Sequence, residues 1–228
     1  MVTMARALVF DMDGVLVDVG DSYRETIAST VEHFTGRKPG RELIQDYKNR
    51  GGFNSDWLLS RKIAADFGVD VPFETVVDHF QRLFLGDNND GLILRERWIA
   101  RPGLFDDLSK RFTLAIFTGR PRAEARLTLD RFAPAIGFEP LVGEDDVSRG
   151  KPDPEGLLKA QQLLPGAALW YIGDTVDDAR CAGAARVPFI GIAAPSNPRH
   201  AELSAVLKQA GAIAVLDDIN YLNEVLPV

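Results

Sequence analysis

Five short apolar runs, with a weaker sixth, constrain what this chain can fold into more than any other feature of its sequence. The runs are apolar almost throughout instead of alternating with polar residues, which is typical of strands that helices cover on both faces. Helical patterns lie between them, and strands that alternate with helices indicate βαβ units and a mostly parallel sheet. The runs are ALVF before Asp11, FTLAIF before Thr118, PLVG before Glu144, ALWYIG before Asp174, PFIGIA before Ala194 and, weakest, AIAV before Leu216.

Three helices are predicted between these strands from the residues at their starts. RPRAEARLTLDRFA carries Pro121 in its first turn, where a proline is tolerated. In DPEGLLKAQQLL we expect Asp153 as the N-cap and Pro154 as the first helical residue. DTVDDARCAGAA has carboxylates in its first turn, where the helix dipole favours them. The expected apolar stripe of the second helix is Leu157, Leu158 and Leu164.

Residues 19–95 have a different pattern. Four of their segments are helical in period, and none of the four follows a buried-strand pattern. We therefore expect an α-helical domain at 19–95, inserted into a doubly wound α/β core domain formed by 1–18 and 96–228. The four segments are SYRETIASTVEHFTG, RELIQDYKNR, SDWLLSRKIAADFG and FETVVDHFQRLFLG.

Charge and composition exclude several classes of partner. The formal net charge is −7 at pH 7 with a pI near 5.0, so we expect no nucleic-acid partner, because phosphate backbones select basic surfaces. No apolar stretch is long enough to span a bilayer and the N-terminus lacks a signal-peptide pattern, so we expect no membrane partner and a cytoplasmic location. The single cysteine, Cys181, is compatible with a reducing compartment, and its neighbours in DARCAGAAR predict a packed thiol.

Polar residues gather where the predicted strands end. In open α/β sheets, ligands bind beyond the carboxyl ends of the strands, so these residues form the candidate site. Several acids that converge there repel one another unless a cation lies among them. Mg²⁺ fits, because it prefers oxygen ligands and takes one or two carboxylates together with water and substrate phosphate. The residues are Asp11, Asp13, Thr118, Gly119, Lys151, Asp174, Asp177 and Asp178.

This set of residue types favours phosphoryl transfer. With Mg²⁺ present, Asp11 can stay ionised and attack phosphorus, which forms an aspartyl-phosphate. The Thr118 hydroxyl, the Gly119 amide and Lys151 would hold the transferring oxygens. Asp13 follows two residues later, on the same side of an extended chain, where its carboxyl can protonate the leaving alkoxide and then deprotonate the attacking water.

The segments DMDG, TGR, KP and GDTVDD, in this order, resemble the four motifs of the haloacid dehalogenase (HAD) superfamily, in its phosphatase branch. The helical insertion resembles that superfamily's subfamily I cap, as in proteins of the phosphoglycolate phosphatase and β-phosphoglucomutase kind. The resemblance implies a Rossmann-like core and makes Asp11 both nucleophile and metal ligand. It makes Asp13 the acid/base, and a metal ligand through its backbone carbonyl.

The resemblance also assigns the remaining motif residues. Thr118 binds phosphate, Lys151 neutralises it, Asp174 ligates Mg²⁺, and Asp178 orients either the metal's water or Lys151. The role of Asp177 stays open.

Two departures from the family pattern matter. Arg120 stands where many relatives carry an uncharged polar residue, so it either adds charge near the phosphate or faces solvent. The namesake dehalogenases lack an acid two residues after the nucleophile, so Asp13 favours phosphoryl chemistry over cleavage of a carbon–halogen bond.

Specificity is expected in the loop at residues 46–60, DYKNRGGFNSDWLLS. A glycine pair between helices can form a loop that moves over a cleft, and we predict substrate contacts from Arg50 and Asn54. The alternative is an ordinary helix–helix turn, with Trp57 packed inside the helical domain.

These observations predict a Mg²⁺-dependent phosphatase for a small phosphorylated metabolite. The family resemblance suggests phosphoglycolate, a sugar phosphate or an amino-alcohol phosphate such as histidinol phosphate, and no residue chooses among them. The alternatives are a phosphomutase or phosphotransferase that uses the same phospho-Asp11, and a non-catalytic binding protein on this fold. The sequence leaves monomer and homodimer equally open.

Overall fold

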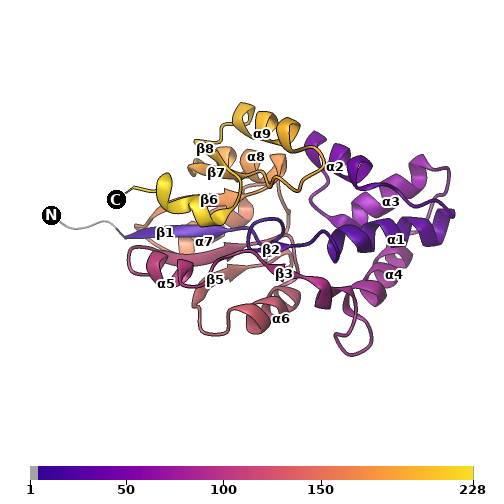
Figure 1. Ribbon diagram of the computed structural model, residues 1–228, viewed down its shortest axis with the longest axis horizontal. Helices are drawn as coiled ribbons and strands as arrows, with labels where there is room; N and C mark the ends of the chain where they lie inside the picture. The colour runs from indigo at the N-terminus through magenta and orange to yellow at the C-terminus, as the bar shows by residue number, and fades with distance from the viewer. Residues whose placement is uncertain (1–4, 228) are drawn as a thin grey trace. The chain divides into compact units, whose positions relative to one another are not determined.

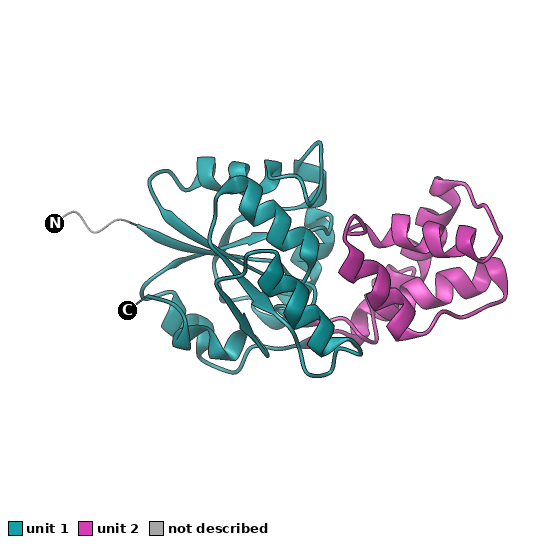
Figure 2. Cartoon of the chain, turned by 90° about the horizontal axis from the view of Figure 1, so that it is seen from above, with its two compact units in different colours: residues 1–17, 98–228 teal, residues 18–97 magenta. Residues whose placement is uncertain are grey.

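The computed structural model describes residues 5–227, and the chain divides into two compact units. One unit consists of the segment that ends at Val17 together with the segment that begins at Trp98, and the other is Asp18–Arg97 (Figure 2). Within the described residues, no helix has the length and apolar character that crossing a membrane requires.

The first unit contains a six-stranded sheet (Figure 1), and its strands follow the order β5-β4-β1-β6-β7-β8. Every neighbouring pair is parallel, and the chain order reverses at β1, as in doubly wound α/β folds. The predicted fold class is confirmed, including the weak last strand. The strands are β1 Arg6–Phe10, β4 Thr113–Phe117, β5 Phe138–Val142, β6 Ala168–Gly173, β7 Phe189–Ile192 and β8 Ala214–Leu216.

Helices bury both faces of this sheet. Ala7 and Val9 share one face and belong to a core cluster with residues of α7, α8 and α9. Phe10 points to the opposite face, where its ring packs edge-on against Phe105 of α5 at 5.7 Å. The helices are α5 Leu104–Leu108, α6 Arg122–Phe132, α7 Glu155–Leu163, α8 Val176–Ala185 and α9 His200–Gln209, with short 3-10 helices at Glu144–Asp146 and Ile219–Glu224.

Two helix starts lie one residue later than predicted. Pro121 and Pro154 each precede the first helical residue. Asp153 is therefore not the N-cap, although its carboxylate accepts the backbone N–H of Glu155 at 3.0 Å.

The predicted apolar stripe of α7 is partly wrong. Leu157 is fully buried, whereas Leu158 is 41% exposed. Adjacent residues of an α-helix point about 100° apart, so burial of one side chain does not require burial of the next.

The second unit is α-helical. Its helices are α1 Tyr23–Thr35, α2 Arg41–Arg50, α3 Asp56–Asp66 and α4 Phe73–Leu85, followed by a 3-10 helix at Leu92–Arg95. Helix α1 packs against α3 and α4, and α4 buries Val76, Phe80 and Phe84 at a four-residue spacing that forms one helix face. The chain enters and leaves this unit through a two-stranded sheet of β2 Val17–Asp18 and β3 Arg97–Trp98.

Candidate active site

Parallel pairing brings the candidate residues to one edge of the sheet. Phe10 of β1 is level with Ile116 of β4 and with Ile172 of β6. The next residue, Asp11, donates its backbone N–H to the Ile172 carbonyl at 2.8 Å and so continues this register. Thr118 and Asp174 therefore follow their strands on either side of Asp11.

Lys151 joins two of the acids. Its Nζ lies 2.9 Å from Oδ1 of Asp11 and 2.8 Å from Oδ1 of Asp178. The Lys151 side chain is only 1% exposed, and its ammonium lies 4.9 Å from the ring centre of Phe117 and 5.4 Å from that of Tyr171. Two carboxylates and two aromatic faces thus compensate the ammonium for its lost hydration.

Asp178 is held by its own helix and by the sheet. Its Oδ2 accepts hydrogen bonds from the backbone N–H and the hydroxyl of Thr175 at 3.0 and 2.6 Å, while Thr175 Oγ1 accepts the Asp178 N–H. The Tyr171 hydroxyl donates to Oδ1 at 2.8 Å. With both oxygens engaged in this way, Asp178 is placed to orient Lys151.

Neither Thr175 nor Tyr171 was predicted to contact Asp178. The Thr-x-x-Asp spacing at the start of α8 is a capping-box signal that predicts Thr175. No sequence signal singles out the Tyr171 hydroxyl, because its ring reads as an ordinary residue of a buried strand.

The acids of this cluster have opposite pKa shifts. Burial raises the pKa of Asp11 to about 7, against the opposing effect of Lys151, and the negative charges of Asp178 and Asp13 add to the rise. Burial would also raise the pKa of Asp178, but Lys151, Thr175 and Tyr171 outweigh it and lower that pKa. Burial alone would lower the pKa of Lys151, yet Asp11 and Asp178 raise it above its ordinary value.

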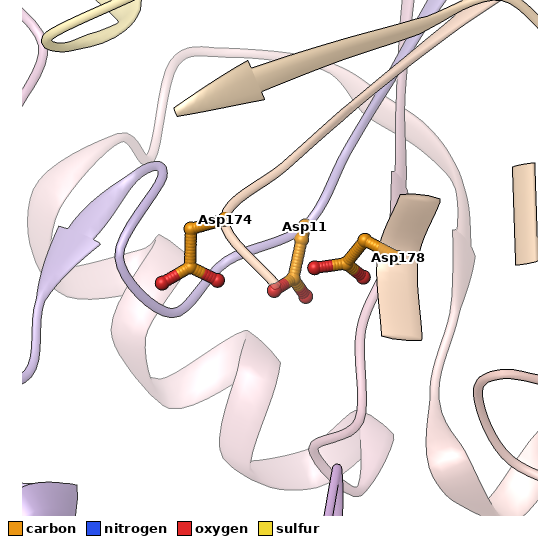
Figure 3. A group of neighbouring side chains, drawn as sticks. All are labelled: Asp11, Asp174 and Asp178. Carbon is orange, nitrogen blue, oxygen red and sulfur yellow. The ribbon is translucent and has the colours of Figure 1, made fainter. Parts of the chain in front are cut away.

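The residues present fit a magnesium ion. Carboxylate oxygens of Asp11, Asp174 and Asp178 lie within 4.8 Å of one another (Figure 3), and oxygens are the ligands that Mg²⁺ prefers. Gly14 has a φ of +73°, and a Cβ there would overlap the Asp174 carboxylate. Both carboxylate oxygens of Asp178 are already engaged, by Lys151, Tyr171 and Thr175, so Asp11 and Asp174 are the side chains best placed to hold the ion.

Arg120 lies beside Asp13. Its Nε and Nη2 are 2.7 and 2.5 Å from Oδ1 of Asp13. The Arg120 side chain is 1% exposed, so the expectation that it faces solvent is wrong. The Asp13 side chain is 23% exposed, which leaves part of this carboxylate open to solvent.

Thr118 and Gly119 follow β4. The Thr118 side chain is buried, and its Oγ1 accepts the backbone N–H of Arg120 at 3.2 Å. The hydroxyl proton can therefore point elsewhere, toward an acceptor such as a phosphate oxygen. Gly119 is half-buried.

The predicted specificity residues belong to the helical unit. Arg50, exposed at the end of α2, lies over the ring of Tyr47 at 5.3 Å. Asn54 is half-buried in the loop before α3. Lys48 of the same segment is buried and forms an ion pair with Asp56. Substrate contacts from Arg50 and Asn54 stay predictions.

Cys181 and Asp177 are both buried side chains of α8. The Cys181 thiol is buried and lies 3.2 Å from the Asp153 carbonyl, and burial raises its pKa to about 12, so the prediction of a packed thiol is confirmed. Asp177 is buried in the first turn of α8, with Arg180 at 3.7 Å.

Comparisons with known proteins find chains of similar sequence and fold. The chain is 32% identical to an imidazoleglycerol-phosphate dehydratase of Phytophthora nicotianae over 95% of its own length, but it spans about half (51%) of that protein. It is 29% identical to a phosphorylated carbohydrates phosphatase of Thermotoga maritima, with 96% of this chain and 99% of that one covered. The crystal structure of a haloacid dehalogenase-like hydrolase from Bacteroides fragilis has the same fold, with a TM-score of 0.75 at 20% identity over 96% of this chain and 99% of that one.

The family assignment rests on most of the chain. Residues 5–186, which include all four motifs, match the haloacid dehalogenase-like hydrolase family. The resemblance drawn from the motifs is thereby confirmed, and this chain belongs to the haloacid dehalogenase-like hydrolase family.

Proposed function

We propose that this chain is a Mg²⁺-dependent phosphatase that hydrolyses a small phosphorylated metabolite through an aspartyl-phosphate intermediate on Asp11. The observation that carries the proposal is the contact of Lys151 with Asp11 at 2.9 Å beside Asp174. A nucleophilic carboxylate, a fixed ammonium and a second acid at a sheet edge are the parts that phosphoryl transfer requires. Mg²⁺, when bound, would supply charge that keeps Asp11 ionised and polarises the phosphoryl oxygens.

The residues of this chain divide the reaction between them. Asp11 attacks phosphorus and becomes phosphorylated, while the Thr118 hydroxyl and the Lys151 ammonium bind the phosphoryl oxygens. Asp13 donates a proton to the leaving oxygen and afterwards takes one from the water that hydrolyses the phosphate from Asp11. Asp178 contributes by keeping Lys151 in place.

The substrate class follows from two lines of support. The names of the two relatives described above both refer to small phosphorylated compounds, a carbohydrate phosphate and imidazoleglycerol phosphate. The first relative is about twice as long as the matching segment, so the dehydratase activity in its name is not transferred to this chain. We propose that the substrate is a small phosphate monoester from a group that includes sugar phosphates, phosphoglycolate and histidinol phosphate.

A panel of such esters tests the proposal. Phosphate release would be measured with Mg²⁺ and with a chelator, using Asp11→Asn as the blank. Metal-dependent release from one compound, well above the others and absent in the variant, is the expected result. If phosphate appears only when a second sugar phosphate is present as acceptor, the chain is a phosphotransferase or mutase. No release under any condition, with Mg²⁺ still bound, would identify a binding protein.

Assembly and location stay predictions. Sedimentation of the purified chain decides between monomer and homodimer, and fractionation of the source cells tests the expected cytoplasmic location.

A further inference from the structure

We propose that Arg120 is a positioning residue for Asp13: it holds one carboxylate oxygen so that the other is aimed at the reacting oxygens. The inference rests on the proposed function, because it assigns Arg120 a part in the proton transfers of that reaction. Such a part differs from both expectations drawn from the sequence, charge near the phosphate and exposure to solvent.

The contact between the two side chains is one-sided. Both Nε and Nη2 of Arg120 lie against the same oxygen, Oδ1 of Asp13. Among the described residues no hydrogen bond to the other oxygen, Oδ2, is found, and the ion-pair contact with Arg120 is also made through Oδ1. A purely structural Arg–Asp pair commonly uses both oxygens in a bidentate arrangement. Here one oxygen is fixed and the other is left available, which is the arrangement a proton-transfer group requires.

Arg120 is itself held at several points, so it can act as a rigid support. Its Nη1 donates to the Thr128 hydroxyl of α6 at 2.8 Å. Its backbone N–H donates to Thr118 Oγ1 at 3.2 Å, and its carbonyl accepts the Glu144 N–H at 2.9 Å. A guanidinium presents its donors in a planar fork, so fixing one end fixes the direction of the other.

This support connects two parts of the site. The backbone of Arg120 orients the Thr118 hydroxyl, and its side chain orients Asp13, which follows a different strand. The register of β1 and β4 keeps the two segments adjacent. Small errors in the placement of a reacting group can cost about 100-fold in rate, so a rigid link of this kind has a kinetic consequence.

Leaving groups separate positioning from a structural role. An alkyl phosphate needs a proton on its departing oxygen, whereas p-nitrophenolate departs as a stable anion without one. Loss of Arg120 should therefore slow phosphorylation of Asp11 by an alkyl ester and leave its phosphorylation by p-nitrophenyl phosphate nearly unchanged. The later attack of water needs Asp13 for both substrates, so a burst of nitrophenol should precede slow turnover.

The experiment compares Arg120→Met, Arg120→Lys, Asp13→Asn and the double variant Asp13→Asn/Arg120→Met. Arg122→Met is the matched control, since Arg122 lies two residues away and pairs with Asp146 near the surface. We expect Arg120→Met to lower the rate of Asp11 phosphorylation by an alkyl phosphate about 10- to 100-fold, within the range of general acid catalysis. The rate of its nitrophenol burst should stay within about threefold of wild type. Arg120→Lys should recover part of the loss, and Arg122→Met should match wild type.

The double variant supplies the sharpest comparison. If Arg120 acts through Asp13, adding Arg120→Met to Asp13→Asn should lower the rate with an alkyl phosphate little further. Multiplicative losses in the double variant, equal losses in the rate of Asp11 phosphorylation by the two kinds of substrate, or an Arg120→Met variant with wild-type rates would each overturn the inference.

Failures of the two proposals are distinguishable. If wild type releases no phosphate with Mg²⁺, the proposed function fails before any variant is compared. If wild type is active and the Arg120 variants show none of the expected pattern, only the positioning role fails. Should Arg120→Met not fold, Arg120→Lys in wild-type and Asp13→Asn backgrounds gives the same comparison with the charge retained.

Discussion

The Lys151 ammonium lies 2.9 Å from Oδ1 of Asp11, and both side chains are buried. Burial makes each charge depend on the other, because neither can be hydrated well. Keeping the Asp11 carboxylate ionised and buried therefore lowers the stability of the folded chain.

Asp11→Asn should abolish phosphate release but should not weaken the metal-free fold at pH 8. The pKa of Asp11 is raised to about 7, above its value in the unfolded chain, so the folded carboxyl binds more protons than the unfolded one between these values. Wild-type stability should therefore fall as pH rises through this range, and the variant should lack that fall. Denaturant unfolding of both proteins in the presence of chelator, at pH 5 and at pH 8, measures this change in stability. Asp178→Asn is the contrasting control, and it should be destabilised, because the pKa of Asp178 is lowered in the folded chain.

Lys151→Met should destabilise the chain strongly. It leaves Asp11 and Asp178 buried without their shared cation, and breaking a buried pair costs about 3–5 kcal/mol. Lys159→Met is the matched control, because Lys159 pairs with Asp146 at the surface and should cost under about 1 kcal/mol. Urea unfolding measures both variants. Similarly small losses of unfolding free energy in both variants would show that Lys151 is not needed to neutralise Asp11 and Asp178.

Gly14→Ala should impair magnesium binding more than folding. Gly14 has a φ of +73°, and an added Cβ would overlap the Asp174 carboxylate. Gly36→Ala is the control, because Gly36 has a φ of +70° with no atom within 4 Å of the added Cβ, so it reports the backbone cost of about 1–2 kcal/mol alone. Calorimetric titration with Mg²⁺ measures the affinity, which should drop in Gly14→Ala and stay unchanged in Gly36→Ala. Equal affinities would remove Asp174 from the metal site.

The helical unit should become less stable in mild acid. The rings of His33 and His79 stack at 3.9 Å, and burial, with the nearby His33 and Arg82, lowers the pKa of His79. The unfolded chain therefore binds more protons at this position, so stability should fall as pH drops below about 6.5. His79→Gln should reduce the fall in melting temperature between pH 7.5 and pH 5.5. An unchanged fall would show that the stacked pair does not set the acid sensitivity.

Arg50→Ala should change substrate preference more than general turnover. If Arg50 contacts the leaving group, its loss should lower kcat/KM for the preferred metabolite and leave p-nitrophenyl phosphate largely unaffected. Arg41→Ala, at the opposite end of α2, is the matched control and should leave both rates unchanged. Equal losses on both substrates with Arg50→Ala would count against a specificity role.

Much of the fold could be predicted because the strands are short, apolar and buried on both faces. Each of the six runs became a strand, and the residues after three of them meet at one edge because the strands are parallel. Leu158 shows the limit of such patterns, because an apolar residue next to a buried one need not share its face.

The polar contacts within the site could not be predicted in the same way. Arg120 and Asp13 are 107 residues apart in sequence, and their contact depends on the direction of a long side chain after folding. The Tyr171 hydroxyl is a similar case, because strand periodicity indicates where its ring lies but not what its oxygen binds. In the sequence, Arg120 stands out only as a departure from the family pattern.

The central claim is that phosphate is transferred to Asp11. Wild-type chain would be mixed with Mg²⁺ and a ³²P-labelled substrate, quenched in acid during turnover, reduced with borohydride and digested, so that a phosphorylated aspartate is converted to homoserine. We predict label on the protein before reduction, homoserine at position 11 after it, and neither in Asp11→Asn. Modification at any other residue, or phosphate release without labelled protein and with full rate in Asp11→Asn, would contradict it.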